Sequence, residues 1–336
     1  MPRVATIEDV ASRAGVSVAT VSRALRGLPH VSPATREKVR RIAAELDYRP
    51  NPHASRLAAG RSGTIGVALP VLNSWFYGNV LAGVEAVVAD QDLDLHLVTV
   101  DGPEAMEHFV SELPSLSKRV DGLLVVDVFL PDQLWDDLAG VPMPVATIGL
   151  DPGRFDSVTI DNRTAAREAV EYLLDLGHER VAFIGGDSDR SYELESANLR
   201  RAGMVDALTA RGLRLESELE GSGVFSVAGG RDAMRDLLDG ARPTAVFCAS
   251  DEMAIGALWA AEEAGVAVPD RLSVIGFDDQ PVAEAIGLST VHQPVSTMAA
   301  RAASLVLERL AESDRRIERV VFPTRLEKRR TTDTIT

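Results

Sequence analysis

Two short helices joined by a tight turn are encoded near the start of the chain, in residues 6–26. Apolar residues at 7, 10, 11 and 14 give the first helix one buried face, and Thr6 precedes it as a potential cap. Gly15 ends this helix, and Ser17 is placed to cap the second. The outer face of the second helix carries small, hydroxyl and arginine side chains: Val18, Ala19, Thr20, Ser22, Arg23 and Arg26. Such a face suits a DNA major groove, where bulk would block approach, although an ordinary amphipathic helix pair gives a similar pattern.

Charge is distributed unevenly along the chain. The 336 residues carry a formal net charge of −15, which taken alone argues against a nucleic-acid partner. Residues 1–63, however, hold 11 basic and 5 acidic side chains, a balance of +6, so the remaining 273 residues carry −21. A basic segment on an acidic body directs a polyanion to that segment and repels it elsewhere. The asymmetry therefore favours DNA binding by the N-terminal segment.

Length and composition indicate a soluble cytoplasmic protein of two or three domains. A hydrophobic content of 46% is enough for sizeable cores, and no apolar run reaches the roughly 20 residues of a membrane span. The N-terminus lacks the apolar stretch of a signal peptide. The one cysteine, Cys248, excludes an internal disulfide and lies in an apolar run, which favours a buried small hydrophobe. The six histidines are scattered, so we expect no metal site.

A third helix and a linker follow the first two helices. Ser32 and Pro33 mark the start of the third helix, which closes a three-helix head by about Tyr48. Residues 50–63 then read as a linker that contains a short helical segment. About two turns of isolated helix are marginal in water, so this segment needs a partner in order to form.

From Thr64 onward, strands and helices alternate in two series of about 100 residues. Repeated strand–helix units predict parallel sheets covered by helices on both faces, here in two lobes with a ligand cleft between them. The expected strands are 65–69, 95–100, 123–126, 145–148, 181–184, 245–248 and 274–276, and the expected helices are 78–91, 163–176, 199–210 and 252–264.

Polar and aromatic residues cluster where the predicted strands end. Phe76 and Tyr77 follow the first strand, and Asp161, Asp251 and Asp278 each follow a later one. Carboxylates accept hydrogen bonds from hydroxyl pairs, and aromatic faces stack on sugars or nucleobases. Each aspartate also has the spacing of a helix cap. Capping is favoured for Asp251, whereas ligand contact and capping stay equally open for Asp161 and Asp278.

Signatures of catalysis are weak. Gly185-Gly186 lacks the third glycine and distal acid of a dinucleotide site, and no phosphate-binding loop or Gly-x-Ser-x-Gly elbow is present. Asp278-Asp279 suggests a magnesium-dependent phosphohydrolase, but no lysine or further clustered acid supports that reading. We therefore expect a protein that is not an enzyme and needs no cofactor.

Taken together, these residues resemble the lactose-repressor/galactose-repressor family of bacterial transcription regulators. The match spans essentially the whole chain, and its most specific part is Thr6-Ile-x-Asp9-Val-Ala-x-x-Ala14-Gly-Val-Ser17-x-x-Thr20-Val-Ser-Arg23-x-Leu25. Further matches are Ser32-Pro-x-Thr35-Arg-x-x-Val39, Val120-Asp-Gly-Leu-Leu, Asp161-Asn162, Leu176-Gly-His178, Ser273-Val-Ile-Gly-Phe-Asp278 and His292-Gln293-Pro294.

The resemblance implies an all-α helix-turn-helix head and an α/β body like a two-lobed periplasmic binding protein with doubly wound parallel sheets. The head would span 1–50, the hinge helix and linker 51–63, and the body 64–336. Within the body, the first lobe would comprise about 64–161 plus 292–322, and the second about 162–291 plus 323–336. The family implies a homodimer in which each head reads half of a palindromic DNA operator.

Residue roles follow from the same resemblance. The residues that resemble phosphate-positioning groups are Thr6, Ser17, Thr20, Ser22 and Asn51, and those that resemble base readers are Val18, Ala19 and Arg23. Leu57 matches the hinge leucine that enters the minor groove, with Ala54 beside it, although Ala54-Ser55-Arg56-Leu57 departs from the commoner Ala-Arg-x-Leu. The positions that match effector contacts are Phe76, Tyr77, Asp161, Arg200, Phe225, Asp278 and Gln293.

The expected function is a ligand-controlled repressor with a sugar or sugar-like effector between its lobes. The nearly uncharged stretch 71–77 and the candidate acids favour a neutral polyol over a phosphorylated ligand. A nucleobase or nucleoside effector is the alternative, because aromatic pairs also sandwich bases. A less favoured alternative is a cytoplasmic two-lobed solute-binding or enzyme-like protein whose head docks onto another protein.

Overall fold

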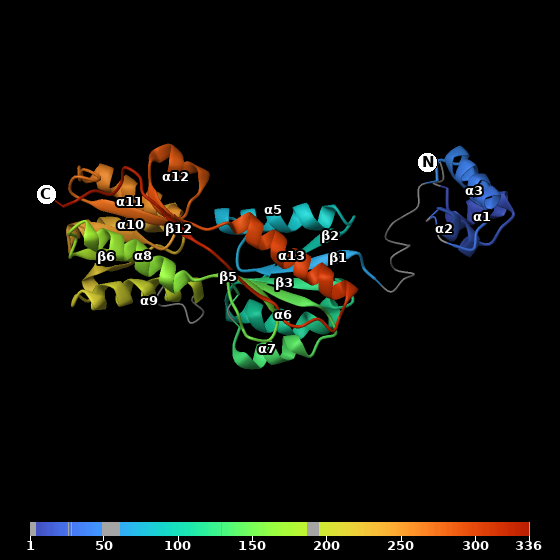
Figure 1. Ribbon diagram of the computed structural model, residues 1–336, viewed down its shortest axis with the longest axis horizontal. Helices are drawn as coiled ribbons and strands as arrows, with labels where there is room; N and C mark the ends of the chain where they lie inside the picture. The colour runs from blue at the N-terminus through green and yellow to red at the C-terminus, as the bar shows by residue number, and fades with distance from the viewer. Residues whose placement is uncertain are drawn as a thin grey trace. The chain divides into compact units, whose positions relative to one another are not determined.

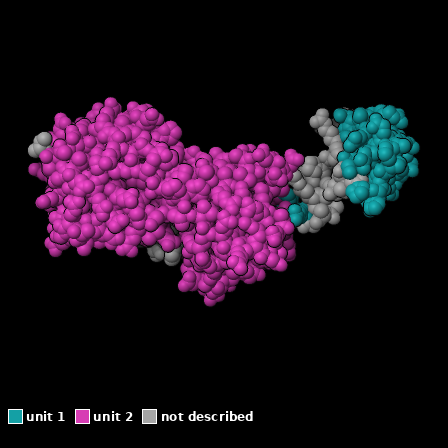
Figure 2. All heavy atoms as spheres, in the orientation of Figure 1, with its two compact units in different colours: residues 1–63 teal, residues 64–336 magenta. Residues whose placement is uncertain are grey.

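The computed structural model describes residues 5–25, 27, 29–48, 61–128, 130–186 and 195–335. The chain forms two compact units, residues 1–63 and residues 64–336, which Figure 2 shows in different colours. The predicted hinge residues Asn51, Ala54 and Leu57 lie outside the described residues, and so does Arg26.

The first unit contains α1 (Ile7–Ala14), α2 (Val18–Leu25) and α3 (Pro33–Glu45). Their apolar faces meet in one small core, which includes the fully buried Val10, Val21 and Val39. Side-chain oxygens cap the helices at Thr6 and Ser32, and Gly15 ends α1 in the left-handed conformation that glycine adopts without strain. The predicted helix pair, its turn and the third helix are confirmed.

The first lobe of the body, here called the N-lobe, is a six-stranded parallel sheet in the order β11-β5-β4-β3-β1-β2. The strands are β1 (Thr64–Leu69), β2 (Asp94–Thr99), β3 (Gly122–Val126), β4 (Val145–Ile148), β5 (Asp156–Ile160) and β11 (Arg319–Phe322). Two helices cover each face of this sheet (Figure 1): α5 (Trp75–Ala89) with α13 (Val295–Ala311), and α6 (Gly102–Leu116) with α7 (Asp132–Ala139).

The second lobe, the C-lobe, is also six-stranded, in the order β12-β10-β9-β8-β6-β7. Its strands are β6 (Val181–Gly185), β7 (Glu220–Ser222), β8 (Ala245–Cys248), β9 (Ser273–Asp278), β10 (Ser289–His292) and β12 (Arg325–Glu327). Its α-helices are α8 (Asn162–Asp175), α9 (Glu195–Ala210), α10 (Val227–Asp239), α11 (Asp251–Glu263) and α12 (Pro281–Ile286). The predicted parallel sheets are found, with one antiparallel pairing at an edge of the C-lobe, where β12 pairs with β10.

The chain passes between the lobes after β5, after β10 and after β11. Each lobe is therefore assembled from segments that are far apart in the sequence. The carboxyl ends of the central strands of both sheets lead into the loops that line one cavity, which is the arrangement expected of ligand sites in open parallel sheets.

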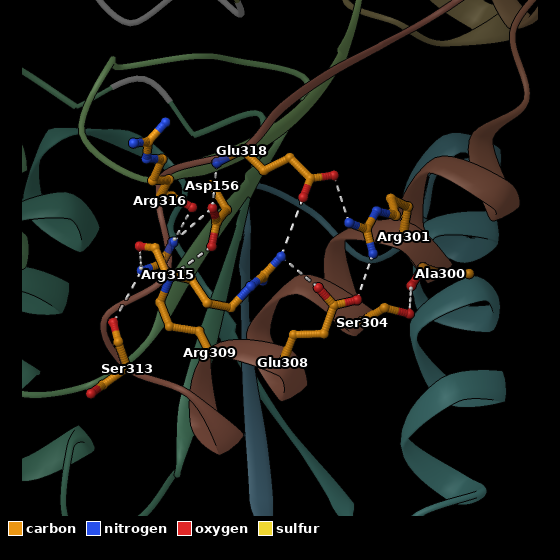
Figure 3. A network of polar contacts seen from close by, with 10 residues as sticks. All are labelled: Asp156, Ala300, Arg301, Ser304, Glu308, Arg309, Ser313, Arg315, Arg316 and Glu318. Carbon is orange, nitrogen blue, oxygen red and sulfur yellow. Dashed lines mark hydrogen bonds and ion pairs between the residues drawn. The ribbon is translucent and has the colours of Figure 1, made fainter.

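A buried ion pair holds the segment after α13 against the start of β5 (Figure 3). The carboxylate of Asp156 is fully buried and accepts from Arg309 at 2.7 and 2.9 Å and from the backbone N–H of Glu318 at 2.7 Å. Arg301 bridges Glu308 and Glu318 beside it, at 2.7 and 2.6 Å. These contacts fix the turn from which β11 enters the sheet beside β5.

A buried histidine fixes the C-terminal segment to the C-lobe. His178 lies within hydrogen-bond distance of Thr244 Oγ1 through Nδ1 (3.1 Å), and of Ser273 Oγ and the Asp333 carbonyl through Nε2 (3.0 Å each). Burial lowers the pKa of His178, so the ring is held neutral. The Leu176-Gly-His178 motif thus has a structural role in docking the tail.

Candidate nucleic-acid interface and effector site

The outer face of α2 is exposed, as the sequence predicts. Val18, Ala19 and Arg23 are exposed, and Thr20 and Ser22 are partly exposed, while Val21 and Ala24 on the opposite face are fully buried. Val18 is 41% exposed, although it is a branched apolar residue. The packing of the head therefore leaves the small and cationic side chains of α2 free to meet a partner.

Two of the residues expected to position phosphates, Thr6 and Ser17, also cap helices. Thr6 and Asp9 form a reciprocal capping box at α1. Ser17 Oγ accepts from the Thr20 N–H at 3.1 Å and lies 2.9 Å from Thr20 Oγ1. These residues therefore stand at the starts of α1 and α2, where backbone N–H groups favour an anion such as phosphate.

A cavity of about 420 Å³ lies in the body, lined by both lobes. Six of the seven effector positions expected from the sequence line it: Phe76, Tyr77, Arg200, Phe225, Asp278 and Gln293. The lining also includes polar residues that sequence reasoning missed, notably Asp127, Asn162, Ser196 and Glu252. The cavity is large enough for a small molecule of one or two rings.

Two aromatic rings at the start of α5 form one wall of the cavity. Phe76 and Tyr77 stand edge to face, with ring centroids 5.2 Å apart and planes at 84°. Tyr77 is 5% exposed, and burial together with the nearby Asp127 and Asp278 raises the pKa of its hydroxyl well above the usual value, so it stays protonated. Phe225, from the C-lobe loop before α10, lines the cavity as well.

Arg200 of α9 is a buried cation that makes two hydrogen bonds inside the protein. It donates to Asn162 Oδ1 at 2.8 Å and to the Ala249 carbonyl at 2.6 Å, and its guanidinium lies 3.6 Å from the Phe277 ring centroid. The carboxylate of Asp278 is 4.0 Å away. The local network therefore fixes Arg200 in one orientation, with its charge partly balanced before any ligand enters.

Asp278 ends β9 with its backbone in a strained conformation, at φ 122°. It accepts from Gln293 Nε2 at 2.6 Å. Burial raises its pKa to about 6, although Arg200 and the Gln293 hydrogen bond act in the opposite direction. The strand end and the crossover after β10 thus meet at one buried carboxyl group in the cavity.

Asp127 is the most informative residue that sequence reasoning missed. It directly follows β3 and is 5% exposed; its Oδ2 accepts from Ser196 Oγ of the C-lobe at 3.0 Å. Its Oδ1 is buried and has no hydrogen-bond partner among the described residues. Burial raises its pKa to about 7, against the Ser196 hydrogen bond and Arg200. The rule that selected Asp278, a carboxylate at the carboxyl end of a strand, would have found it.

Asp161 was predicted to contact the effector, but the structure places it outside the cavity lining. Its side chain is exposed, accepts from the Thr164 N–H at 2.9 Å as the cap of α8, and does not line the cavity. Hydrogen bonds from Thr164 lower its pKa, consistent with a carboxylate engaged in capping. Its neighbour Asn162 is the one that turns inward, 3% exposed and bonded to Arg200.

Asp251 differs from its predicted capping role. Ser250 caps α11 instead, accepting from the Met253 N–H at 3.3 Å. Asp251 is fully buried and accepts from Thr290 Oγ1 at 2.6 Å and from the Gln280 N–H at 2.8 Å. It therefore ties α11 to β10 and to the start of α12 rather than contacting a ligand.

Over the part of the chain that the structure describes, no group of three or more His, Cys, Asp or Glu side chains is arranged to hold a metal ion. Over the same residues, no helix is long and apolar enough to cross a membrane.

Comparison with known proteins decides the family. Residues 6–51 match the model "Bacterial regulatory proteins, lacI family", and residues 170–332 match "Periplasmic binding protein-like domain". Catabolite control protein A of Staphylococcus xylosus is 34% identical, over 97% of this chain and 99% of its own length. The chain belongs to the lacI family of bacterial regulatory proteins. The resemblance inferred from the sequence is therefore confirmed, together with the helix-turn-helix head and the two-lobed body.

Solved structures of two transcription regulators agree with this fold. The lac repressor dimer bound to operator and the anti-inducer ONPF superposes with a TM-score of 0.87 at 30% identity, covering 98% of this chain and 100% of that one. The transcriptional regulator CelR in complex with cellobiose gives a TM-score of 0.70 at 32% identity, covering 97% and 99%. As a member of this family, the protein is a DNA-binding transcription regulator, and its relatives are regulators rather than enzymes.

Proposed function

We propose that this protein is a dimeric, cytoplasmic repressor that reads a palindromic operator with α2 and is controlled by a neutral sugar bound between its lobes. The exposed face of α2 and the basic balance of the head support operator binding. The lac repressor, solved as a dimer on its operator, is the structural precedent. The division into head 1–50, hinge 51–63 and body 64–336 is part of this proposal.

The charge of the cavity is the observation that carries the effector assignment. Asp101, Asp127, Glu252 and Asp278 line it, and Arg200 is the one basic side chain among its described lining residues. Since Arg200 already donates to Asn162 and Ala249, a phosphate would meet more negative than positive charge there.

A neutral polyol fits the same groups. The carboxyl groups of Asp127 and Asp278 belong to the cavity lining, and carboxyl oxygens accept hydrogen bonds from hydroxyl groups such as those of a sugar. The rings of Phe76, Tyr77 and Phe225 offer apolar faces to the C–H surface of a pyranose. The neighbour CelR, solved with cellobiose, supports this class of ligand.

A nucleobase or nucleoside is the second candidate. The edge-to-face pair of Phe76 and Tyr77, with Phe225 in the same cavity lining, also suits a planar base. A base would present few hydroxyl donors to Asp127 and Asp278, which is why we place it second.

The test is a thermal-shift panel on the full-length protein, with neutral sugars including cellobiose, their phosphates, and nucleosides. We expect stabilisation by a neutral sugar and none by its phosphate. Asp278→Ala should weaken binding of that sugar by about 1–3 kcal/mol through lost hydrogen bonds, with operator binding in its absence unchanged. Asp137→Ala, an exposed carboxylate on α7, is the matched control. Stabilisation by a nucleoside with no response to any sugar would reverse the assignment.

A further inference from the structure

The first turn of α5 lacks a cap of its own. Ser74 occupies the N-cap position with extended backbone angles (φ −116°, ψ 147°), yet its side chain makes no capping hydrogen bond. The first turn contains no acidic residue either. The first backbone N–H groups of a helix have no partner within it, so this end of α5 needs an acceptor from elsewhere.

That acceptor comes from the opposite lobe. Glu252 of α11 accepts from the backbone N–H of Trp75, the first residue of α5, at 3.2 Å. Glu252 also lies in the first turn of its own helix. Its carboxylate is therefore close to the N-terminal ends of two helices, both of which favour negative charge.

We propose that Glu252 is a positioning residue: it caps α5 from the opposite lobe and so holds the aromatic wall of the cavity in place. The next two residues of α5 are Phe76 and Tyr77, so the capped turn carries that wall. The functional importance of this wall rests on the proposed effector site. The contact itself joins a side chain to a backbone N–H and needs no ligand.

Only the ionised form of Glu252 is a strong cap, which makes the contact sensitive to pH. Burial raises the pKa of Glu252, and the Trp75 N–H opposes that effect. The other charged groups lining the same cavity are Asp101, Asp127, Arg200 and Asp278. The cap is therefore complete above the pKa of Glu252 and weakens as the pH falls through it.

Selective labelling tests this directly. The chain has three tryptophans, so ¹⁵N-tryptophan gives the full-length protein backbone signals from Trp75, Trp135 and Trp259, with Trp75 assigned through Trp75→Phe. We expect the Trp75 amide to titrate with an apparent pKa above that of an ordinary glutamate. Glu252→Gln should abolish this titration and speed hydrogen exchange of the Trp75 amide at least tenfold, leaving the Trp135 amide unchanged.

Glu262→Gln is the matched control, because it makes the same charge change at an exposed position of the same helix. It should leave the Trp75 amide as in the wild type. The inference would be overturned if the Trp75 amide still titrated in Glu252→Gln. It would also be overturned if that amide exchanged equally fast in Glu252→Gln and in the wild type. If the variant fails to fold, the wild-type titration still tests the proposal. A Trp75 amide signal that does not change with pH would refute the cap.

No effector is added in these measurements, so the two proposals fail separately. A Glu252-dependent Trp75 amide together with no sugar binding would leave the cap in place and remove only the effector assignment. A Trp75 amide that does not respond to pH, together with sugar binding, would remove the cap and leave the effector assignment in place.

Discussion

Asp127 should make the stability of the body depend on pH in a direction opposite to that of most carboxylates. Its pKa rises from the ordinary 3.8 to about 7 because the group is buried with one oxygen unpaired. One pKa unit corresponds to about 1.4 kcal/mol, so ionised Asp127 costs the native state up to roughly 4 kcal/mol. Relaxation of the native state around a buried charge lowers such a cost, and we therefore expect about 1–3 kcal/mol in practice.

The sign follows from which state releases its proton first. Below about pH 4 the carboxyl is neutral in both states and costs nothing. As the pH rises from about 4 to 7, the unfolded chain ionises while the native state holds its proton, so stability falls. Asp127→Asn carries no charge and keeps an oxygen that can accept from Ser196. The variant should therefore be more stable than the wild type at pH 8.

The assay is urea unfolding of full-length wild type and Asp127→Asn at equal concentration, at pH 5 and pH 8. Fluorescence of the three tryptophans, all within residues 64–336, reports on this body, and far-ultraviolet circular dichroism checks that both probes give one transition. The advantage of the variant should be largest at pH 8 and fall by more than half at pH 5. Asp137→Asn, exposed on α7, should show no such change. An equal difference at both pH values would refute the reasoning.

Three other perturbations address the head, the N-lobe and the tail. Arg23→Ala should weaken operator binding by about 1–3 kcal/mol in a fluorescence anisotropy titration, and wild-type affinity should fall steeply with salt; an affinity indifferent to salt would contradict the assigned interface. Asp156→Ala leaves Arg309 without its buried carboxylate and should lower the free energy of unfolding by about 3 kcal/mol. Asp232→Ala, which breaks an exposed ion pair on α10, should lower it by under about 1 kcal/mol. Because burial lowers the pKa of His178 below 6.5, the wild type should lose stability as the pH falls below about 6.5, and His178→Gln should lack that part of the slope in melts between pH 5 and 7.5.

The elements that the sequence predicted well are those whose signals are local. The cap at Thr6, the break at Gly15 and the apolar spacing of α1 all act within one or two turns, and so do the short apolar runs that became β3, β4 and β8. The strand-end rule then placed Asp278 in the cavity. The same rule applied to the residue after β3 would have added Asp127.

The misses depend on contacts that are distant in the sequence. The helix α13 was not assigned, and its fit rests on α5: a Cβ added at Gly83 would stand 2.3 Å from the Ser296 carbonyl oxygen. The antiparallel β12 is likewise set by its partner β10. Asp161 and Asn162 are adjacent, and the backbone of the crossover decides which one faces the cavity. Sequence periodicity carries no information about that choice.

The order in which segments of the body are joined has a consequence for synthesis on the ribosome. The N-lobe sheet is complete only when β11 pairs with β5 and α13 packs beside α5, yet both of these late segments follow the whole helical part of the C-lobe. While the chain emerges, the three-helix head can fold early, because its contacts are local. The body must wait with an unpaired β5 edge and an uncovered sheet face until nearly all residues are available, a state prone to association with other chains. A chain that ends before residue 295 would therefore carry a folded head on a body whose N-lobe sheet cannot be completed. Such fragments should depend on chaperones or be degraded.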